Sequence, residues 1–279
     1  MSHYRVEKVL NNNVVIAEHA SEEVILIGKG IGFNRKKGSE VPSAEVEKLF
    51  VMKNEKEQES YLKLLPQVEQ SLLDVTIEAI ELISKKTGLP LNEHIHVGLM
   101  DHLSFAQART VSGLQIRNPF LAETKVLYPK EFSIALEIVH LIKKRIHIEL
   151  PKEEAGFIAL HIHSALQDKS LGRINAHSQL VSELVGLIET QMEVTLDKES
   201  IDYMRLVRHL RFAIERVDNE ERVEEPKAIT MLLKQEYPMC YNLSWKLIKV
   251  MQRVLRKPVF DAEAVYLTMH LQRVQSKYK

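Results

Sequence analysis

The chain has 279 residues, and its 38 Lys and Arg are balanced by 38 Asp and Glu, so the formal net charge is zero. This balance excludes a whole-chain attraction to nucleic acid, and any RNA site must be a local patch. The single cysteine, Cys240, excludes a disulfide framework and a cysteine-based zinc site within one chain, and we expect it to be a packed thiol. No apolar run approaches the roughly 18 residues that span a bilayer, and Met1–Arg5 lacks the apolar core of a signal peptide, so we expect a cytoplasmic protein without membrane insertion.

The first part of the chain, to about residue 55, has the pattern of short strands. Asn11–Asn13 and the glycine-rich segment Gly28–Phe33 separate the apolar runs, and both segments are typical of tight turns. We therefore predict a small antiparallel sheet or sandwich, which gains stability by dimerising because about 55 residues bury little core. The predicted strands are Val6–Leu10, Val14–Ala17, Val24–Ile27 and Leu49–Met52.

The charged stretch Lys53–Glu59 is predicted to be a linker, and from about residue 60 the apolar residues recur with the period of helices. One apolar stripe ends at Gly88, which we expect to be a helix C-cap.

The helical part contains an internal repeat. His102–Arg109 matches His209–Arg216, and Glu154–Ile162 matches Glu263–Leu271, while the pair Tyr128-Pro129 recurs as Tyr237-Pro238. The offsets are 107, 109 and 109 residues, in the same order along the chain. The repeat predicts two homologous all-α helical-bundle domains after the small all-β domain. The predicted domains are 1–58, 59–170 and 171–279.

Each copy carries one histidine in its first repeated segment and one in its last. The four residues are His102 and His161 in the first copy and His209 and His270 in the second. A single histidine on an apolar helix is most often a hydrogen-bonded core residue, but the duplication favours a functional pair. Imidazoles that titrate near neutrality suit phosphoryl acceptance. We expect no metal, because ligands in short-range spacing such as His-Glu-x-x-His are missing from the sequence.

A local patch in the N-terminal domain could bind RNA. Lys8, Asn13 and Lys29 supply donors near turns, Gly28 allows close backbone approach, and Phe33 could stack on an unpaired base. The residues fit a solvated sheet rim with a core phenylalanine equally well. The segment Gly28–Phe33 is not a nucleotide-binding P-loop, and no nucleophile elbow or paired-carboxylate pattern stands out, so we expect neither an enzyme nor a cofactor.

Arg205, Arg208, Arg211 and Arg216 surround His209. They form either a solvated helix face or a cluster that could pair with a phosphorylated histidine.

Taken together, these motifs resemble the BglG/SacY family of transcription antiterminators over the whole chain. The segments that carry the resemblance are Lys8–Val14, Gly28–Phe33, Asp101-His102, Ala159–Ile162, Arg208–Leu210 and Thr268–His270. Leu91–His96, Asn118–Phe120 and Tyr241–Leu243 are most similar to the glucose-operon branch. The resemblance implies an RNA-binding domain followed by two regulatory domains that respond to the sugar phosphotransferase system.

The resemblance also implies a mechanism. The N-terminal domain would dimerise and bind a hairpin in leader mRNA through Lys8, Asn13, Gly28, Lys29 and Phe33, preventing terminator formation and inducing sugar-transport genes. The EIIB domain of a sugar-specific permease, here glucose, would phosphorylate the first regulatory domain, and HPr could act on the second. His102, His161, His209 and His270 fall at the places of the family's phosphorylatable histidines.

Two other functions remain open from the sequence. A histidine phosphotransferase relay would pass phosphate onward and would not need the N-terminal patch. A DNA-binding regulator would need a helix-turn-helix, for which the β-rich N-terminus offers no recognition helix.

Overall fold

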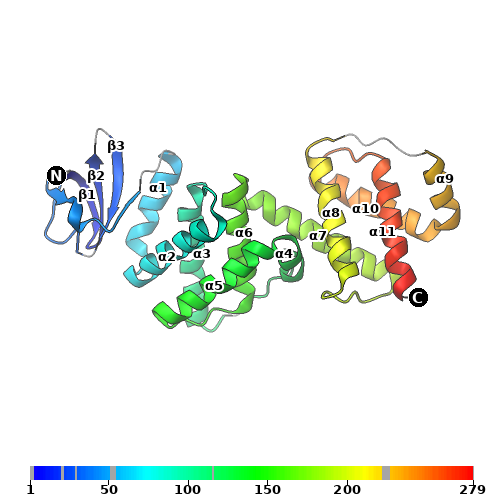
Figure 1. Cartoon of the computed structure of the whole chain (residues 1–279), viewed down its shortest axis with the longest axis horizontal. Helices are drawn as coiled ribbons and strands as arrows, with labels where there is room; N and C mark the ends of the chain where they lie inside the picture. The colour runs from blue at the N-terminus through cyan, green and yellow to red at the C-terminus, as the bar shows by residue number, and fades with distance from the viewer. Residues whose placement is uncertain are drawn as a thin grey trace. The chain divides into compact units, whose positions relative to one another are not determined.

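The computed structural model describes residues 3–19, 22–28, 30–50, 55–114, 116–221 and 227–278 (Figure 1). Strands come first and helices follow, as the sequence predicts. The strands are β1 (His3–Asn11), β2 (Val14–His19), β3 (Glu22–Ile27), β4 (Glu40–Pro42) and β5 (Lys48–Phe50).

The five strands form one antiparallel sheet in the order β4-β1-β2-β3-β5. β1 and β2 form a hairpin in which Asn11 pairs with Val14, so the turn consists of Asn12 and Asn13, as the asparagine run predicts. β4 was not predicted from the sequence, because it has only three residues and ends in a proline. Pro42 has no N–H to donate, and β4 lies at the edge of the sheet, where proline is tolerated.

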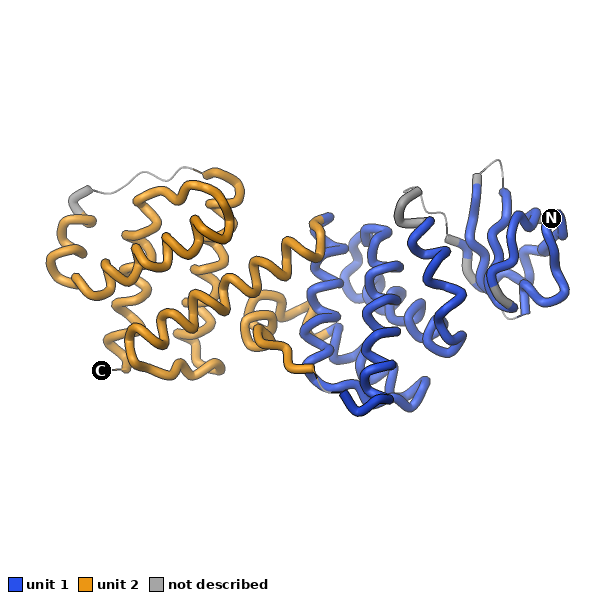
Figure 2. Tube along the Cα trace, turned by 180° about the vertical axis from the view of Figure 1, so that it is seen from behind, with its two compact units in different colours: residues 1–115, 134–168 blue, residues 116–133, 169–279 orange. Residues whose placement is uncertain are grey.

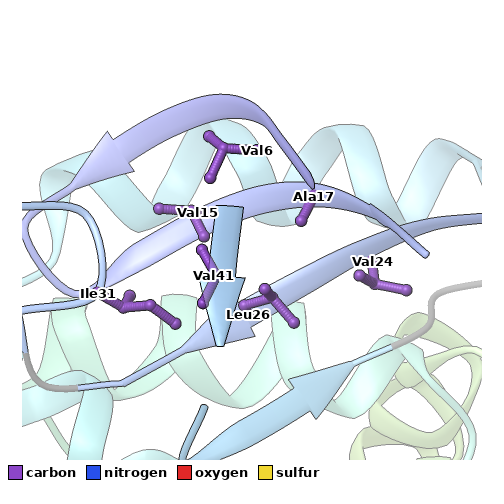
Figure 3. Packing of buried hydrophobic residues seen from close by; sticks show 7 residues of the cluster. All are labelled: Val6, Val15, Ala17, Val24, Leu26, Ile31 and Val41. Carbon is purple, nitrogen blue, oxygen red and sulfur yellow. The ribbon is translucent and has the colours of Figure 1, made fainter. Parts of the chain in front are cut away.

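One apolar cluster of this domain lies on one face of the sheet (Figure 3), while Val14, Ile16, Ile25 and Ile27, which point to the other face, are buried as well. Alternate residues of a strand point to opposite faces, so Val15 and Ala17 of β2 meet Val24 and Leu26 of β3 on the same side. Ile31, from the segment after β3, completes this cluster with Val6 and Val41 and is fully buried. The glycine-rich segment is therefore anchored to the sheet by an apolar side chain.

The helices begin at residue 55, not at about residue 60, so residues 55–59 of the predicted linker Lys53–Glu59 are helical. These residues form the first half of α1, because Glu55–Glu59 contains no helix breaker and Glu59 pairs with Lys63 one turn later. Residues 51–54 lie outside the described residues. The helices are α1 (Glu55–Leu64), α2 (Gln70–Thr87), α3 (His94–Val111), α4 (Leu121–Leu127), α5 (Pro129–Ile146), α6 (Lys152–Gln167), α7 (Leu171–Met192), α8 (Ile201–Asp218), α9 (Lys227–Glu236), α10 (Pro238–Leu255) and α11 (Ala262–Tyr278).

The helix bounds confirm the internal repeat. α3 and α8 have equal length and are offset by 107 residues, and α5 and α10 have equal length and are offset by 109. We call α2–α6 the first copy and α7–α11 the second copy. Gly88 ends α2 with a φ of 64°, the left-handed conformation predicted for a C-cap glycine. Cys240 is buried, as expected for a packed thiol.

The compact units of the structure do not coincide with the copies (Figure 2). One unit contains residues 1–115 and 134–168, and the other contains residues 116–133 and 169–279. The segment 116–133, which includes α4, therefore packs with the helices of the second copy, on α7 and α8. Within the described ranges, no helix is both long and apolar enough to cross a membrane.

Candidate RNA-binding loop and histidine sites

The segment 28–33 folds back on the β1–β2 turn. Gly28 N donates to Asn13 O at 3.0 Å, and Gly32 N donates to Asn12 O at 2.8 Å. The Asn13 side chain adds a third bond, because its Oδ1 accepts from Gly30 N at 2.6 Å. Gly30 has a φ of 72°, which side chains other than Asn or Asp rarely adopt. Two segments far apart in sequence thus form one rigid surface loop.

This loop presents Phe33 to solvent while it buries Ile31. The Phe33 side chain is 64% exposed, whereas Ile31 is fully buried. An exposed aromatic ring at a fixed loop position is the arrangement that stacks on an unpaired base. Phe33 is therefore not a core residue, which argues against the alternative that this segment is a solvated sheet rim with a core phenylalanine.

Of the other predicted RNA-contacting residues, Gly28 and Asn13 belong to this loop and its hydrogen bonds. Lys8 is exposed on β1, and Asn13 is half-buried in the turn beneath Gly30. Lys29 lies outside the described residues. Of the nearby cations, Arg35 pairs with Glu45 at 2.6 Å and Lys37 pairs with Glu7 at 2.6 Å.

Gly28 has a structural requirement that the sequence did not reveal. A Cβ at this position would lie 2.2 Å from the Glu45 carbonyl oxygen, closer than any real contact. We expect Gly28→Ala to shift the backbone and to destabilise the N-terminal sheet by roughly 2 kcal/mol. Amide exchange of residues 14–27 would measure this loss. Gly38→Ala is a suitable comparison, because its added Cβ would meet nothing within 4 Å and any cost would come from the φ of 86° alone. Equal behaviour of the two variants would contradict the steric account.

The first histidine pair lies between α3 and α6. The rings of His102 and His161 are 5.1 Å apart between centroids and tilted by 42°. His102 Nε2 lies 3.0 Å from Glu154 Oε2, and Arg109 donates to the other oxygen, Oε1, at 2.8 Å. The Glu154 carboxylate is only 3% exposed. A buried carboxylate therefore bridges a histidine and an arginine that are seven residues apart on one helix.

The electrostatics of this site keep Glu154 charged and His161 neutral. Burial raises the pKa of Glu154, but its contacts with His102 and Arg109 outweigh burial, and the net pKa lies below the ordinary value. Burial, and then the neighbouring His102, lowers the pKa of His161 to about 3. Gly98 faces this ring, since a Cβ there would lie 3.1 Å from His161 Nδ1. The His161 imidazole is thus buried and uncharged, and it lies next to His102.

The second histidine pair, between α8 and α11, is arranged differently. The rings of His209 and His270 are stacked, with centroids 3.5 Å apart and planes 21° apart. Arg216 and Glu263 form a bidentate pair with two contacts of 2.7 Å beside them. Burial lowers the pKa of both histidines, that of His270 to about 4, with His209 adding to the effect.

Cavities open on both sides of the stacked pair in the second copy. One has a volume of about 310 Å³ and is lined by Arg216, Glu263 and Tyr266 besides the two histidines. The other has a volume of about 260 Å³ and includes Arg205 and Arg273. Both histidines of the second copy therefore line open space, whereas His161 in the first copy is 8% exposed.

The carboxylates that organise both sites were not predicted from the sequence. Arg109 with Glu154 and Arg216 with Glu263 occupy the same places in the repeated segments. The signal was available, because the arginine and the glutamate are identical in both copies. The arginines around His209 therefore have different environments. Arg216 pairs with Glu263, Arg211 pairs with Glu215, and Arg208 is exposed. Among the residues that the structure describes, no group of three or more His, Cys, Asp or Glu side chains could hold a metal ion.

Because His161 is buried, we expect the stability of the first copy to depend on pH. The pKa of His161 is about 3 in the folded chain and near 6.5 when unfolded, so between these values the unfolded chain binds one more proton. The contribution of His161 to the free energy of unfolding is fully present above pH 6.5. It decreases by about 1.4 kcal/mol per pH unit as the pH falls toward 3. We expect His161→Leu to reduce the pH slope of first-copy stability by one proton, measured by amide exchange of α6 at pH 5, 6 and 7. An equal reduction by His140→Leu, at an exposed position on α5, would contradict this assignment.

Comparisons with known proteins match one domain in the N-terminal part of the chain and a second domain twice in the helical part. The CAT RNA binding domain family matches residues 4–59, and the PRD domain family matches residues 77–165 and again 182–274. Each PRD match spans one histidine pair, and the CAT match contains the loop with Phe33.

Relatives match over nearly the whole chain. The chain is 50% identical over 275 residues to the "PtsGHI operon antiterminator" of Bacillus subtilis (strain 168), covering 98% of both chains. It is 38% identical to the "GlcA/glcB genes antiterminator" of Staphylococcus carnosus (strain TM300), covering 97% of this chain and 96% of that protein. A solved structure, "Crystal structure of GlcT CAT-PRDI", is 48% identical and covers 59% of this chain and 98% of its own, with a TM-score of 0.53.

Proposed function

The chain belongs to the family of transcription antiterminators that carry a CAT RNA-binding domain and two PRD domains, and from this premise we propose that it binds a leader-mRNA hairpin as a dimer. Binding prevents formation of the overlapping terminator and induces genes of the glucose phosphotransferase system. The glucose assignment rests on relatives named for the ptsGHI operon, for glcA/glcB and as GlcT. The protein acts by binding in the cytoplasm, without catalysis and without a cofactor. The first copy is accordingly PRD1, and the second copy is PRD2.

The observation that carries the RNA-binding proposal is the exposed Phe33 on a loop held by three backbone and side-chain hydrogen bonds. Phe33 stacks on an unpaired base, Asn13 and Gly28 set the loop, and Lys8 and Lys29 contact phosphates. Because the chain has no net charge, attraction to the phosphates must come from local cations such as these. A dimer doubles every contact.

Phosphorylation regulates the protein through the histidine pairs. We assign acceptance in PRD1 to His102, whose side chain is 14% exposed, in preference to the more buried His161. The phosphorylated EIIB domain of the permease supplies the phosphoryl group: the bond between phosphorus and the donor side chain breaks as a P–N bond to His102 forms. In PRD2, His209 and His270 are further acceptors served by HPr, and in PRD1 the more buried His161 accepts only after His102.

The new phosphoryl group disturbs the buried carboxylate. It brings a charge of roughly −1.5 to −2 beside Glu154, which is already ionised. The two anions repel, and Arg109 leaves the carboxylate for the phosphoryl oxygens, with which an arginine forms stronger bidentate bonds. α3 and α6 then separate or repack, which changes how the dimer presents its RNA-binding domains.

The two other functions are not favoured. The relatives are named antiterminators and a CAT RNA-binding domain is present, which a phosphotransferase relay would not need. In the described part of residues 3–50 the elements are five strands and one short 3-10 helix, so no recognition helix for DNA is present there.

The proposal is tested with the full chain and a leader hairpin of the ptsGHI operon. We expect retention of the hairpin in a gel at low salt, and loss of retention after phosphorylation by the glucose permease's EIIB domain. His102→Ala should remain unphosphorylated in PRD1 and keep binding RNA. If the unphosphorylated chain retains no hairpin, the RNA-binding proposal fails. If His102→Ala is still inhibited, His102 is not the acceptor.

A further inference from the structure

The helix that follows the RNA-binding domain packs on PRD1. α1 lies against α3, and its Tyr61 is 1% exposed. The Tyr61 ring meets the His96 ring of α3 edge-on, with centroids 6.2 Å apart and planes at 68°. Burial lowers the pKa of His96 to about 4, so the imidazole under Tyr61 is uncharged at neutral pH. The packing of α1 on α3 thus includes a buried aromatic contact.

A helix from an earlier part of the chain packs on PRD2 in the same way. α4 lies against α8 and α7. Tyr203 of α8 donates its hydroxyl to Glu123 Oε1 at 2.8 Å, and both residues are 1% exposed. Arg211 donates to Leu127 O at 3.2 Å, and its guanidinium lies 5.2 Å from the centroid of the Tyr128 ring.

The two docked helices lie on equivalent residues. The offset of 107 residues that separates His102 from His209 also separates His96 from Tyr203. α1 therefore contacts α3 at the same helix position at which α4 contacts α8. We infer that the face of α3 around His96 and the matching face of α8 around Tyr203 are helix-receiving surfaces, with α1 as the occupant on PRD1 and α4 on PRD2. α1 connects the PRD1 surface to the RNA-binding domain.

The two surfaces hold their occupants with different strength. On PRD2, the Tyr128 ring is 4% exposed and seated beside Arg211. At the matched place on PRD1, Ser104 replaces Arg211, and an open groove of about 390 Å³ is lined by Ser104, Leu72 and Gln67. Among the described residues, the Tyr61 hydroxyl has nothing equivalent to the Tyr203–Glu123 hydrogen bond. α1 is consequently the occupant that is released more easily.

The test is amide exchange of the full chain. The substitutions lie in α1 and α4, so the cores of PRD1 and PRD2 are left unchanged. We expect the parent to exchange faster in α1 than in α4. Tyr61→Ala should raise exchange in residues 57–64 at least tenfold and leave 121–127 unchanged, and Glu123→Ala should do the reverse. Tyr61→Phe is the matched control, since it keeps the ring on His96 and should leave α1 protected.

Two results would overturn the inference. One is unchanged exchange of α1 in Tyr61→Ala, and the other is equal opening of α1 by Tyr61→Phe and Tyr61→Ala. Exchange in α3 and α6 must stay at the parental level, which shows that PRD1 remains folded. The exchange experiment does not involve RNA, so it tests only whether α1 is docked on PRD1. The idea that α1 links this surface to RNA binding rests on the proposed function. Hairpin retention by Tyr61→Ala, measured separately, therefore distinguishes failure of the surface from failure of the function.

Discussion

Replacement of Arg109 by methionine is expected to lower the local stability of PRD1 by about 3 kcal/mol. Arg109 holds one oxygen of Glu154, a carboxylate that is 3% exposed, and methionine removes the cation while filling similar space. The remaining contact at 3.0 Å is with His102, which balances the charge only when it is protonated. The cost comes from the buried anion that is left behind rather than from the lost ion pair itself.

This loss should be reversed by removing the anion as well. Arg109→Met combined with Glu154→Met should recover most of the stability, because two apolar groups then pack where the ion pair was. Amide exchange of α3 and α6 measures the change. The fluorescence of Trp245, the single tryptophan, follows PRD2 and should not shift.

An exposed ion pair in the same unit provides the control. Arg145 donates twice to Glu78, at 2.7 and 2.8 Å, but the two side chains are 56% and 38% exposed. Arg145→Met should therefore change stability by at most about 0.5 kcal/mol. If Arg145→Met and Arg109→Met cost the same, burial of Glu154 does not decide the energetics of the site.

Loss of the Phe33 ring is expected to weaken hairpin binding at least tenfold. Stacking of one base on an aromatic side chain contributes roughly 1–3 kcal/mol, and a dimer loses two rings. The ring is 64% exposed, so Phe33→Ala should leave the sheet folded. Fluorescence titration of a labelled ptsGHI leader hairpin, repeated at several salt concentrations, measures the effect.

Salt dependence separates stacking from charge at this loop. Phe33→Ala removes no cation, so the slope of log affinity against log salt should stay constant, whereas Lys8→Gln, which removes two cations from a dimer, should reduce that slope by about 2. Phe105 of α3 is the matched control, because it is also 64% exposed. Equal loss of binding in Phe105→Ala and Phe33→Ala would show that the loop is not the RNA contact.

Much of this architecture could be predicted from the sequence. The asparagine turn, the glycine C-cap and the repeat each depend on local backbone preferences or on periodicity, which a sequence states directly. The repeat assigned two of the four histidines to each copy, and the structure brings each two together, between α3 and α6 and between α8 and α11. The family resemblance was confirmed by the domain matches and the relatives.

The errors and omissions concern tertiary packing. The charged composition of Lys53–Glu59 suggested a linker, but α1 is stabilised by packing of Tyr61 on α3, which no local pattern reports. β4 is too short to show alternation. The role of Glu154 was hidden because a carboxylate at the start of an apolar helix looks like ordinary first-turn acid, and only the fold brings it to Arg109.

The position of segment 116–133 has a consequence for how this protein could have evolved. The internal repeat indicates a duplication, yet the two copies do not pack as separate units. α4 belongs to the first copy in sequence but packs on helices of the second. A recombination crossover placed between the copies, near residue 170, would separate Val126 and Leu127 from the helices that cover them. We therefore expect that exchange of a single copy between relatives succeeds only where the neighbouring copy offers α4 a matching surface on α7 and α8.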